Sequence, residues 1–183
     1  MQKNPRRYSK FLTLLFLGAT FFSGCASKAR IESMVVSQAP GSPIAKSRYE
    51  KSIFLGEVTG GEPTNPLWIP EVGNPEFREA LYQTLQSQGL LSTQQETSMY
   101  VLTVNLLGLS QPAFGLDFTV TSHVNYLLTK RTTGEVVLAA TLKAPYTATT
   151  GDAYFAATRL QLGNEGSIKA NIEMFLRRLY ETP

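Results

Sequence analysis

Apolar and polar residues alternate with a period of two in the second half of the chain. Residues 100–109 form one such series, and residues 116–129 form a more regular one. In the second series, the apolar side carries Phe118, Val120, Ser122, Val124, Tyr126 and Leu128. Alternation of this kind predicts antiparallel strands with one buried side and one solvated side.

Two further strands are predicted on either side of this pair. Residues 52–59, SIFLGEVT, predict an earlier strand that two glycines bring to an end. Residues 130–135 predict a turn, in which Gly134 can take a positive φ. Residues 135–146 then predict a returning strand that ends by Pro145, because proline lacks the N–H that a strand ladder uses.

Two other segments follow the helical period of 3.6 residues. The first begins with Asn74 as the N-cap and Pro75 in the first turn, and Gly89 ends it. Its mainly apolar face is formed by Phe77, Ala80, Leu81, Thr84, Leu85 and Gln88. The second helix covers residues 167–181, with a stripe at Ile168, Ile172, Phe175, Leu176 and Leu179. An earlier start around 154–162 stays open, because Gly163 and Gly166 blur the boundary.

The order of strand, helix, three strands and helix predicts an α+β two-layer sandwich. We expect a mostly antiparallel sheet of about four strands, with two helices packed on one face. Residues 49–183 would form this single domain. Residues 25–48 contain prolines and glycine without sustained periodicity, and they predict a tether, within which 31–36 (IESMVV) could form a short strand. A flexible stretch of about twenty residues would span roughly 25 Å.

The N-terminus has the three parts of a secretory signal peptide. Residues 1–10 are basic, residues 11–22 are apolar and uncharged, and the small residues Ser23 and Gly24 precede Cys25. The apolar part is twelve residues long, whereas a helix that crosses a bilayer needs about 20. Residues 1–24 are therefore predicted to be a signal peptide.

Phe22-Ser23-Gly24-Cys25 resembles the lipobox of bacterial lipoproteins, in which Leu is usual at the position of Phe22. The resemblance implies cleavage between Gly24 and Cys25 and a diacylglyceryl group on the Cys25 thiol. Cys25 is the only cysteine of the chain, so it has no intramolecular disulfide partner. No Asp follows it, which by the same resemblance implies the outer membrane, with the domain facing the periplasm. An ordinary signal peptide or a membrane anchor that happens to contain Cys25 is the alternative.

Removal of the signal peptide changes the charge of the chain. The sequence has 17 Lys and Arg against 14 Asp and Glu, and four of the cations lie before Cys25 with no acid beside them. The mature chain would therefore have 13 cations against 14 acids, a net charge of −1. The basic balance belongs to the signal peptide, and we expect no nucleic-acid partner.

The arrangement of elements also resembles that of the YajG-type lipoproteins and the lipopolysaccharide-assembly lipoprotein. The resemblance rests on the lipobox, the helix FREALYQTLQSQGLL, the meander and the terminal helix NIEMFLRRLY. It implies an envelope domain on the periplasmic side. Folds of this type host many functions, so the arrangement alone assigns none.

Catalytic and metal-binding patterns are weak in this sequence. The stretch around Ser110, GLSQP, has Pro112 where a hydrolase elbow has glycine, and it lies at a strand end. His123, the only histidine, falls on the polar side of a strand. We expect no catalytic residue, no metal site and no cofactor, because the single histidine cannot form an ordinary zinc site and no phosphate-binding glycine motif occurs. The acids Asp117, Glu135 and Asp152 follow no motif.

Three residues are candidates for contact with a partner. Trp68 lies in a proline-rich loop, where it could grip another protein or fold back over the sheet or helix. Lys130 and Arg131 lie at the predicted hairpin turn, where they could meet lipid phosphates or face solvent.

The sequence thus predicts a non-enzymatic lipoprotein, attached to the membrane through Cys25, whose domain meets an envelope protein or a glycolipid. A glycolipid-binding subunit of a lipopolysaccharide-assembly barrel is the alternative function. An acyltransferase-type enzyme ranks last, because the chain has no hexapeptide repeat.

Overall fold

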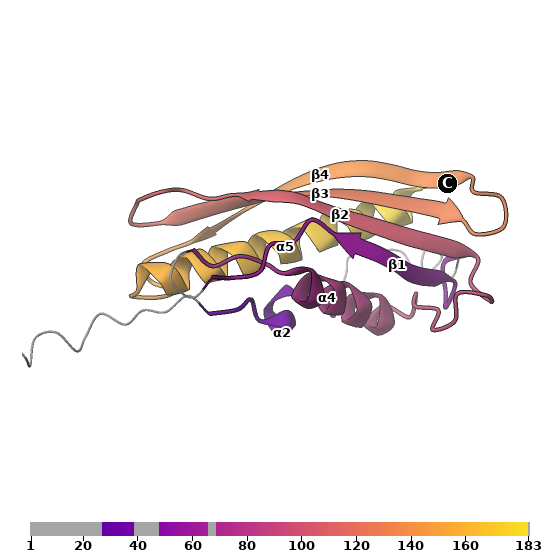
Figure 1. Cartoon of the computed structure of the whole chain (residues 1–183), viewed down its shortest axis with the longest axis horizontal. Coiled ribbons are helices and arrows are strands. Elements are labelled where there is room, and N and C mark those ends of the chain that lie inside the picture. Colours follow the sequence, from indigo (N-terminus) through magenta and orange to yellow (C-terminus); the bar gives the residue numbers. More distant parts are fainter. Residues whose placement is uncertain (1–26, 39–47, 66–68, 183) are drawn as a thin grey trace, which may run out of the picture.

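The structure, a computed structural model, describes residues 27–38, 48–65 and 69–182. Its elements in chain order are α2 (Ile31–Met34), β1 (Ile53–Thr59), α4 (Asn74–Ser87), β2 (Tyr100–Ser110), β3 (Phe118–Lys130), β4 (Val136–Ala148) and α5 (Ala156–Glu181). The strands form one layer, and α4 and α5 lie on the same side of it (Figure 1). The predicted α+β two-layer sandwich is confirmed.

The sheet has the strand order β1-β2-β3-β4. The β2–β3 and β3–β4 pairs are antiparallel, as predicted, whereas β1 pairs with β2 in parallel. A parallel pair needs a crossover connection, and α4 lies in the segment between β1 and β2 and supplies it. The sheet is therefore mixed, with one parallel pair at one edge.

The predicted apolar faces form the core. All six residues of the apolar side of β3 are buried, and so are the stripe residues of α4 and α5. Between sheet and helix, the rings of Tyr126 and Phe175 stack with their centroids 4.5 Å apart. Ser122 is polar but also buried, and its Oγ donates to the carbonyl oxygen of Ser167 at 2.8 Å. The period of two thus identified the correct face, including its one polar member.

The start of α4 differs by one residue from the prediction. The N-cap is Gly73, not Asn74, and no side chain caps the helix. The Asn74 side chain instead accepts a hydrogen bond from the Gly61 N–H at 2.7 Å. Asn74 therefore ties the loop after β1 to the helix rather than capping it.

The strand β4 is longer than predicted. It continues past Pro145 to Ala148, and Pro145 lies opposite Thr121 of β3. β4 is an edge strand, with one side unpaired in the sheet. Proline is tolerated on an edge strand, where one set of N–H groups has no ladder partner, so Pro145 does not end the strand.

The helix α5 begins at Ala156 and passes through both glycines that blurred its predicted start. A Cβ at Gly163 would lie 2.7 Å from Cγ2 of Val120, and one at Gly166 would collide with the ring of Tyr146. The glycines therefore face the sheet and let the helix approach it closely.

The segment 27–38 differs most from the prediction. It contains a single helical turn, α2, where the sequence allows a short strand, and Ala29, Met34 and Val36 are buried. The prediction of a tether over 25–48 is therefore wrong for residues 27–38, which are part of the domain. Residues 39–47 of the predicted tether lie outside the described residues.

Candidate functional site

We call residues 27–38 the anchor segment, because it follows the candidate lipidation site Cys25 after one intervening residue. Its first half lies along α5. The Lys28 carbonyl accepts a hydrogen bond from Nε2 of Gln161 at 3.0 Å, and the Arg30 N–H donates to Oε1 of Glu165 at 2.8 Å. The chain is therefore held by its backbone from Lys28 onward.

An ion pair reinforces this contact. The Arg30 guanidinium donates to Glu165, with the shortest N–O distance at 2.7 Å. The Glu165 side chain is 1% exposed, and Gln161 also donates to it at 2.8 Å. The hydrogen bonds to Glu165, and then its charge, raise the pKa of Arg30 above its usual value. A buried carboxylate needs such partners, so Glu165 acts here as a structural group rather than as a free base.

The second half of the anchor segment is fastened to α4. The Val36 N–H donates to Oγ1 of Thr84 at 3.1 Å. Nε2 of Gln88 donates to the carbonyls of Val36 and Ser37, at 3.1 Å and 3.0 Å. The segment thus bridges both helices, which explains why it is ordered with the domain.

Cys25 and Gly24 lie outside the described residues, but chain geometry limits where Cys25 can be. An extended chain advances at most about 3.6 Å per residue. Cys25 is three residues from Lys28, so its Cα lies within about 11 Å of the Lys28 Cα in any conformation. The site of the candidate lipid anchor is therefore close to the domain surface.

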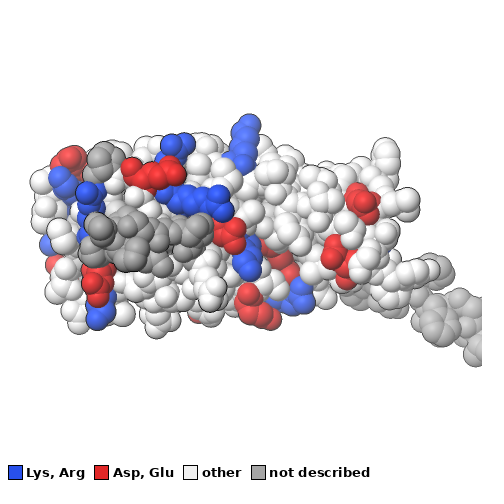
Figure 2. Space-filling model, turned by 180° about the vertical axis from the view of Figure 1, so that it is seen from behind, with Lys and Arg blue, Asp and Glu red and all other residues white. Residues whose placement is uncertain are grey.

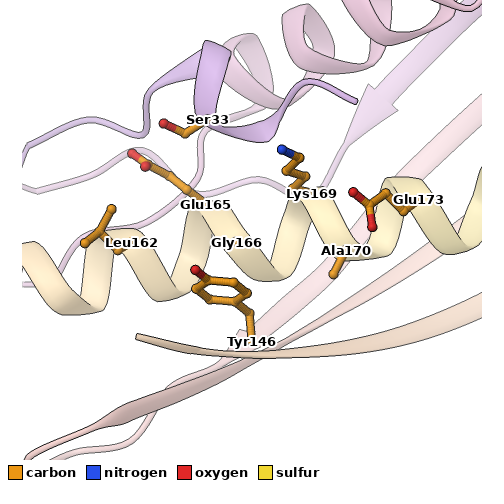
Figure 3. Close-up of a pocket in the computed structure, with 8 residues that line it drawn as sticks. All are labelled: Ser33, Tyr146, Leu162, Glu165, Gly166, Lys169, Ala170 and Glu173. Atoms are coloured by element: carbon orange, nitrogen blue, oxygen red, sulfur yellow. The ribbon is translucent and has the colours of Figure 1, made fainter. Parts of the chain in front are cut away.

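An open groove of about 390 Å³ lies beside the anchor segment, between α5, α2 and β4 (Figure 3). Glu165 and Lys169 point from α5 toward α2, and Tyr146 approaches α5 from β4 (Figure 3). The lining residues are Ser33, Tyr146, Leu162, Glu165, Gly166, Lys169, Ala170 and Glu173. The groove combines charges of both signs, and its most buried charge, Glu165, is already bonded to Arg30 and Gln161.

The predicted contact residues lie in different places. Trp68 is outside the described residues, but Pro70, two positions later, accepts hydrogen bonds from Asn164 at 2.7 Å and Gln111 at 2.9 Å. Lys130 is paired with Glu135 at 2.7 Å, and Arg131 donates to the Ser98 carbonyl at 2.8 Å. Both hairpin cations thus have partners within the chain.

The structure brings together Ser110 and His123, which no motif connects in the sequence. Ser110 Oγ lies 3.2 Å from Nε2 of His123, on the exposed side of the sheet. Within the part of the chain that the structure describes, no carboxylate hydrogen-bonds to this histidine. The residue opposite it on β4 is Lys143. A catalytic serine–histidine pair also needs an acid that orients the histidine, and no such hydrogen bond to His123 is found among the described residues.

The other acids have local partners. Asp117 accepts from the Thr150 N–H, and Asp152 accepts from the Thr149 N–H. Among the described residues, no group of three or more His, Cys, Asp and Glu is arranged to hold a metal ion.

Sequence reasoning missed the Arg30–Glu165 pair. The two residues are 135 positions apart, so no local pattern connects them. The available signal was Glu165 itself. It lies on the side of α5 that is buried, and a buried acid needs a hydrogen-bonding or charged partner.

No protein-family model matches the chain, and no curated protein matches it in sequence. Solved structures do share its fold. A Xanthomonas campestris protein assigned to the DUF330 family covers 82% of this chain and 91% of its own, with a TM-score of 0.52 and 10% identity. A Caulobacter crescentus protein, described as a "putative lipoprotein", covers 75% and 93%, with a TM-score of 0.50 and 16% identity.

These similarities establish a shared fold. The structural neighbours include a protein described as a lipoprotein, which agrees with the class that the N-terminal sequence indicates. Within the described residues, no helix has both the length and the hydropathy needed to cross a bilayer.

Proposed function

We propose that this chain is a non-enzymatic lipoprotein of the bacterial envelope, acylated at Cys25 and held on the periplasmic face of the outer membrane. The observation that carries the proposal is the position of the anchor segment. Cleavage between Gly24 and Cys25 would remove the signal peptide and leave every described contact of the domain in place, since these contacts begin at Lys28.

The non-enzymatic part of the proposal is supported by the surroundings of His123. Its ring bonds to Ser110, and Lys143 lies opposite it on β4. Acyl transfer from serine would also require an acid that orients the histidine, and no carboxylate among the described residues hydrogen-bonds to His123. We therefore propose that the domain binds rather than reacts, with an envelope partner on the surface turned away from the membrane.

Mass spectrometry of the mature N-terminus tests the proposal. We expect a peptide that begins at Cys25 and carries a diacylglyceryl group, recovered from the outer-membrane fraction after density separation. Two or three acyl chains hold a protein almost permanently, because each buried methylene contributes about 0.8 kcal/mol.

Cys25→Ser is the test variant and Ser27→Ala the matched control. We expect the serine variant to lack the lipid and the alanine variant to be processed normally. An N-terminus that begins at Met1, or at an unmodified residue other than Cys25, would contradict the proposal. Crosslinking from solubilised membranes would then identify the partner of the lipidated form.

A further inference from the structure

Large apolar side chains are exposed on two neighbouring loops. In the β2–β3 loop, residues 111–117, Phe114 is 87% exposed and Leu116 is 78% exposed. In the β4–α5 connection, residues 149–155, Tyr154 is 89% exposed and Phe155 is 61% exposed. We call these four residues the apolar loop tips. Exposed apolar groups that gather at one place mark an interaction surface.

Hydrogen bonds join the two loops and shape them. Oδ1 of Asp117 accepts from the Thr150 N–H at 3.1 Å, which connects one loop to the other. Arg159 Nη1 donates to the carbonyls of Ala153 and Tyr154, at 2.9 Å and 2.7 Å. The backbone is thus held from inside the domain, and the Tyr154 side chain is left in solvent.

The apolar loop tips lie at the same end of the domain as Lys28, one of the first described residues after the candidate lipid anchor. Both loops and the start of α5 are at the left end in Figure 1. Lys28 is bonded to Gln161, which is five residues after the first residue of α5 and hence about 7.5 Å along the helix. Cys25 follows within about 11 Å of Lys28. A bilayer that holds the Cys25 lipid therefore comes close to these loops.

The charge distribution at this end agrees with a lipid surface. On the face shown in Figure 2, the corresponding right-hand end shows no Lys or Arg and little acidic surface. The two acids of the loops, Asp117 and Asp152, accept hydrogen bonds from the backbone N–H groups of Thr150 and Thr149. Aromatic side chains with a polar tip, such as tyrosine, favour the boundary between lipid and water.

We propose that the apolar loop tips insert into the interfacial region of the bilayer that holds the Cys25 lipid. The inference rests on the proposed function, because it takes the lipid at Cys25 as given. The loops would act as a second attachment that fixes the orientation of the domain, with the β3–β4 hairpin pointing into the periplasm. The bilayer is favoured over a protein partner because the proposed lipid at Cys25 would bring a lipid surface to this end of the domain.

Site-specific labelling can test this in the full-length lipidated protein. The sulfur of Cys25 is occupied by the lipid and no other cysteine exists, so an introduced cysteine would be the single reactive thiol. Tyr154→Cys, labelled with an environment-sensitive fluorophore, would be reconstituted in phosphatidylethanolamine–phosphatidylglycerol vesicles that contain lipids with a quencher on the acyl chain. We expect a blue shift and quenching that is strongest for shallow quenchers, at a depth of about 5–10 Å.

Met99→Cys is the matched control, because Met99 is an apolar residue that is 60% exposed at the opposite end of β2. Its label should stay unquenched. In the Tyr154→Cys protein, the added pair Phe114→Ser and Leu116→Ser should reduce the quenching. The added pair Leu107→Ser and Val136→Ser, which also removes exposed apolar side chains, should leave it unchanged.

Each other outcome overturns the inference in a recognisable way. Equal, weak quenching at both labels on vesicle-bound, acylated protein would refute loop insertion and leave the proposed function intact. A blue shift at position 154 that grows with protein density, without lipid quenching, would assign the loops to contact between copies. An unacylated N-terminus would refute the proposed function and this inference together.

Discussion

Gly163 and Gly166 set the distance between α5 and the sheet. Glycine inside a helix is unfavourable by about 1 kcal/mol relative to alanine. Here both positions face the sheet, where a methyl group would collide with Val120 or Tyr146. The local cost of the glycines is therefore offset by close packing between the two layers.

Gly166→Ala tests this explanation. We expect the variant to unfold at lower denaturant concentration, because overpacking costs about 1–3 kcal/mol and exceeds the gain of about 1 kcal/mol in helix propensity. In a Tyr146→Ala background, where the ring is gone, the same change should become stabilising. The measurement is the free energy of unfolding of the four proteins in the double-mutant cycle.

Gly163→Ala is the matched control for that cycle. Its methyl group would meet Val120 rather than Tyr146. It should therefore destabilise the domain in both backgrounds. If Gly166→Ala destabilises equally with and without the ring, the contact with Tyr146 does not explain the glycine.

The buried polar residues show the limit of prediction at this scale. Alternation placed Ser122 on the buried side of β3, which the structure confirms. Its partner Asn171, which donates to the Ser122 carbonyl and Oγ at 3.1 Å, is 49 positions away on α5. A pattern within one element predicts which side of that element is buried. It does not predict which residue of another element forms hydrogen bonds with a buried polar group on that side.

At the scale of elements, the anchor segment depends on its neighbours. A single helical turn such as α2 is not stable alone, because the free-energy cost of nucleating a helix exceeds the stabilisation that one turn contributes. The segment is instead held at one end by Glu165 and Gln161 of α5. At the other end it is held by Thr84 of α4 and by Gln88, the residue that follows this helix.

Arg30→Ala should release the first half of this segment. Glu165 would remain buried with fewer donors, which costs about 1–3 kcal/mol. We expect faster amide hydrogen exchange in residues 27–38, while β3 and β4 keep their protection. Mass spectrometry of the exchanged peptides measures both regions in one experiment.

Lys28→Ala is the control for the ion pair. The Lys28 side chain is 82% exposed and its Nζ lies 4.0 Å from Oε1 of Glu76. Such surface pairs contribute about 0–1 kcal/mol, so exchange should change little. Equal effects of the two variants would show that the Arg30–Glu165 pair does not hold the segment.

The regular elements were predictable because their periodicity is local. The strands and the face of α4 followed from spacing alone, and the extension of β4 past Pro145 did not, because sequence does not show which strand is an edge. Residues 27–38 resemble a tether in sequence because their apolar residues follow no sustained period and a stretch with two prolines and a glycine comes next. Their burial depends on surfaces of α4 and α5 that form only in the folded domain.

The candidate lipidation site stays a prediction. The resemblance to a lipobox places it at Gly24 and Cys25, which lie outside the described residues. The apolar loop tips were not singled out, although Phe114 and Leu116 are apolar residues in a turn-like stretch, QPAFGLD, where polar residues are usual. Their exposure, and the closeness of the two loops, needed the fold.

For the molecule as a whole, the proposed lipid at Cys25 would limit how the domain moves on a membrane, because Lys28, which is held by Gln161, follows only three positions later. Insertion of about twenty Gly and Ser residues after Ala26 would add an r.m.s. span of about 25 Å. We expect the labelled, lipidated domain to rotate more freely on vesicles, and the steady-state fluorescence anisotropy of a label at Met99→Cys to fall.

The same insertion after Gly41 is the control. Contacts hold the chain on both sides of that position, at Ser37 by Gln88 and at Arg48 by the Thr182 carbonyl. The attachment to the membrane would keep its length, so the anisotropy should stay close to that of the parent. A fall of equal size would mean that the anchor segment does not restrain the domain.

Pro145 acquires a further role if many copies share one membrane. Molecules confined to a plane with a common tilt meet repeatedly through their sides, and the free border of β4 is one such side. Unpaired strand borders promote stacking into aggregates, and a residue without an amide hydrogen interrupts the row of groups that would join them. Pro145 in the edge strand β4 would thus hinder edge-to-edge strand pairing between neighbouring copies, so that their contacts stay reversible.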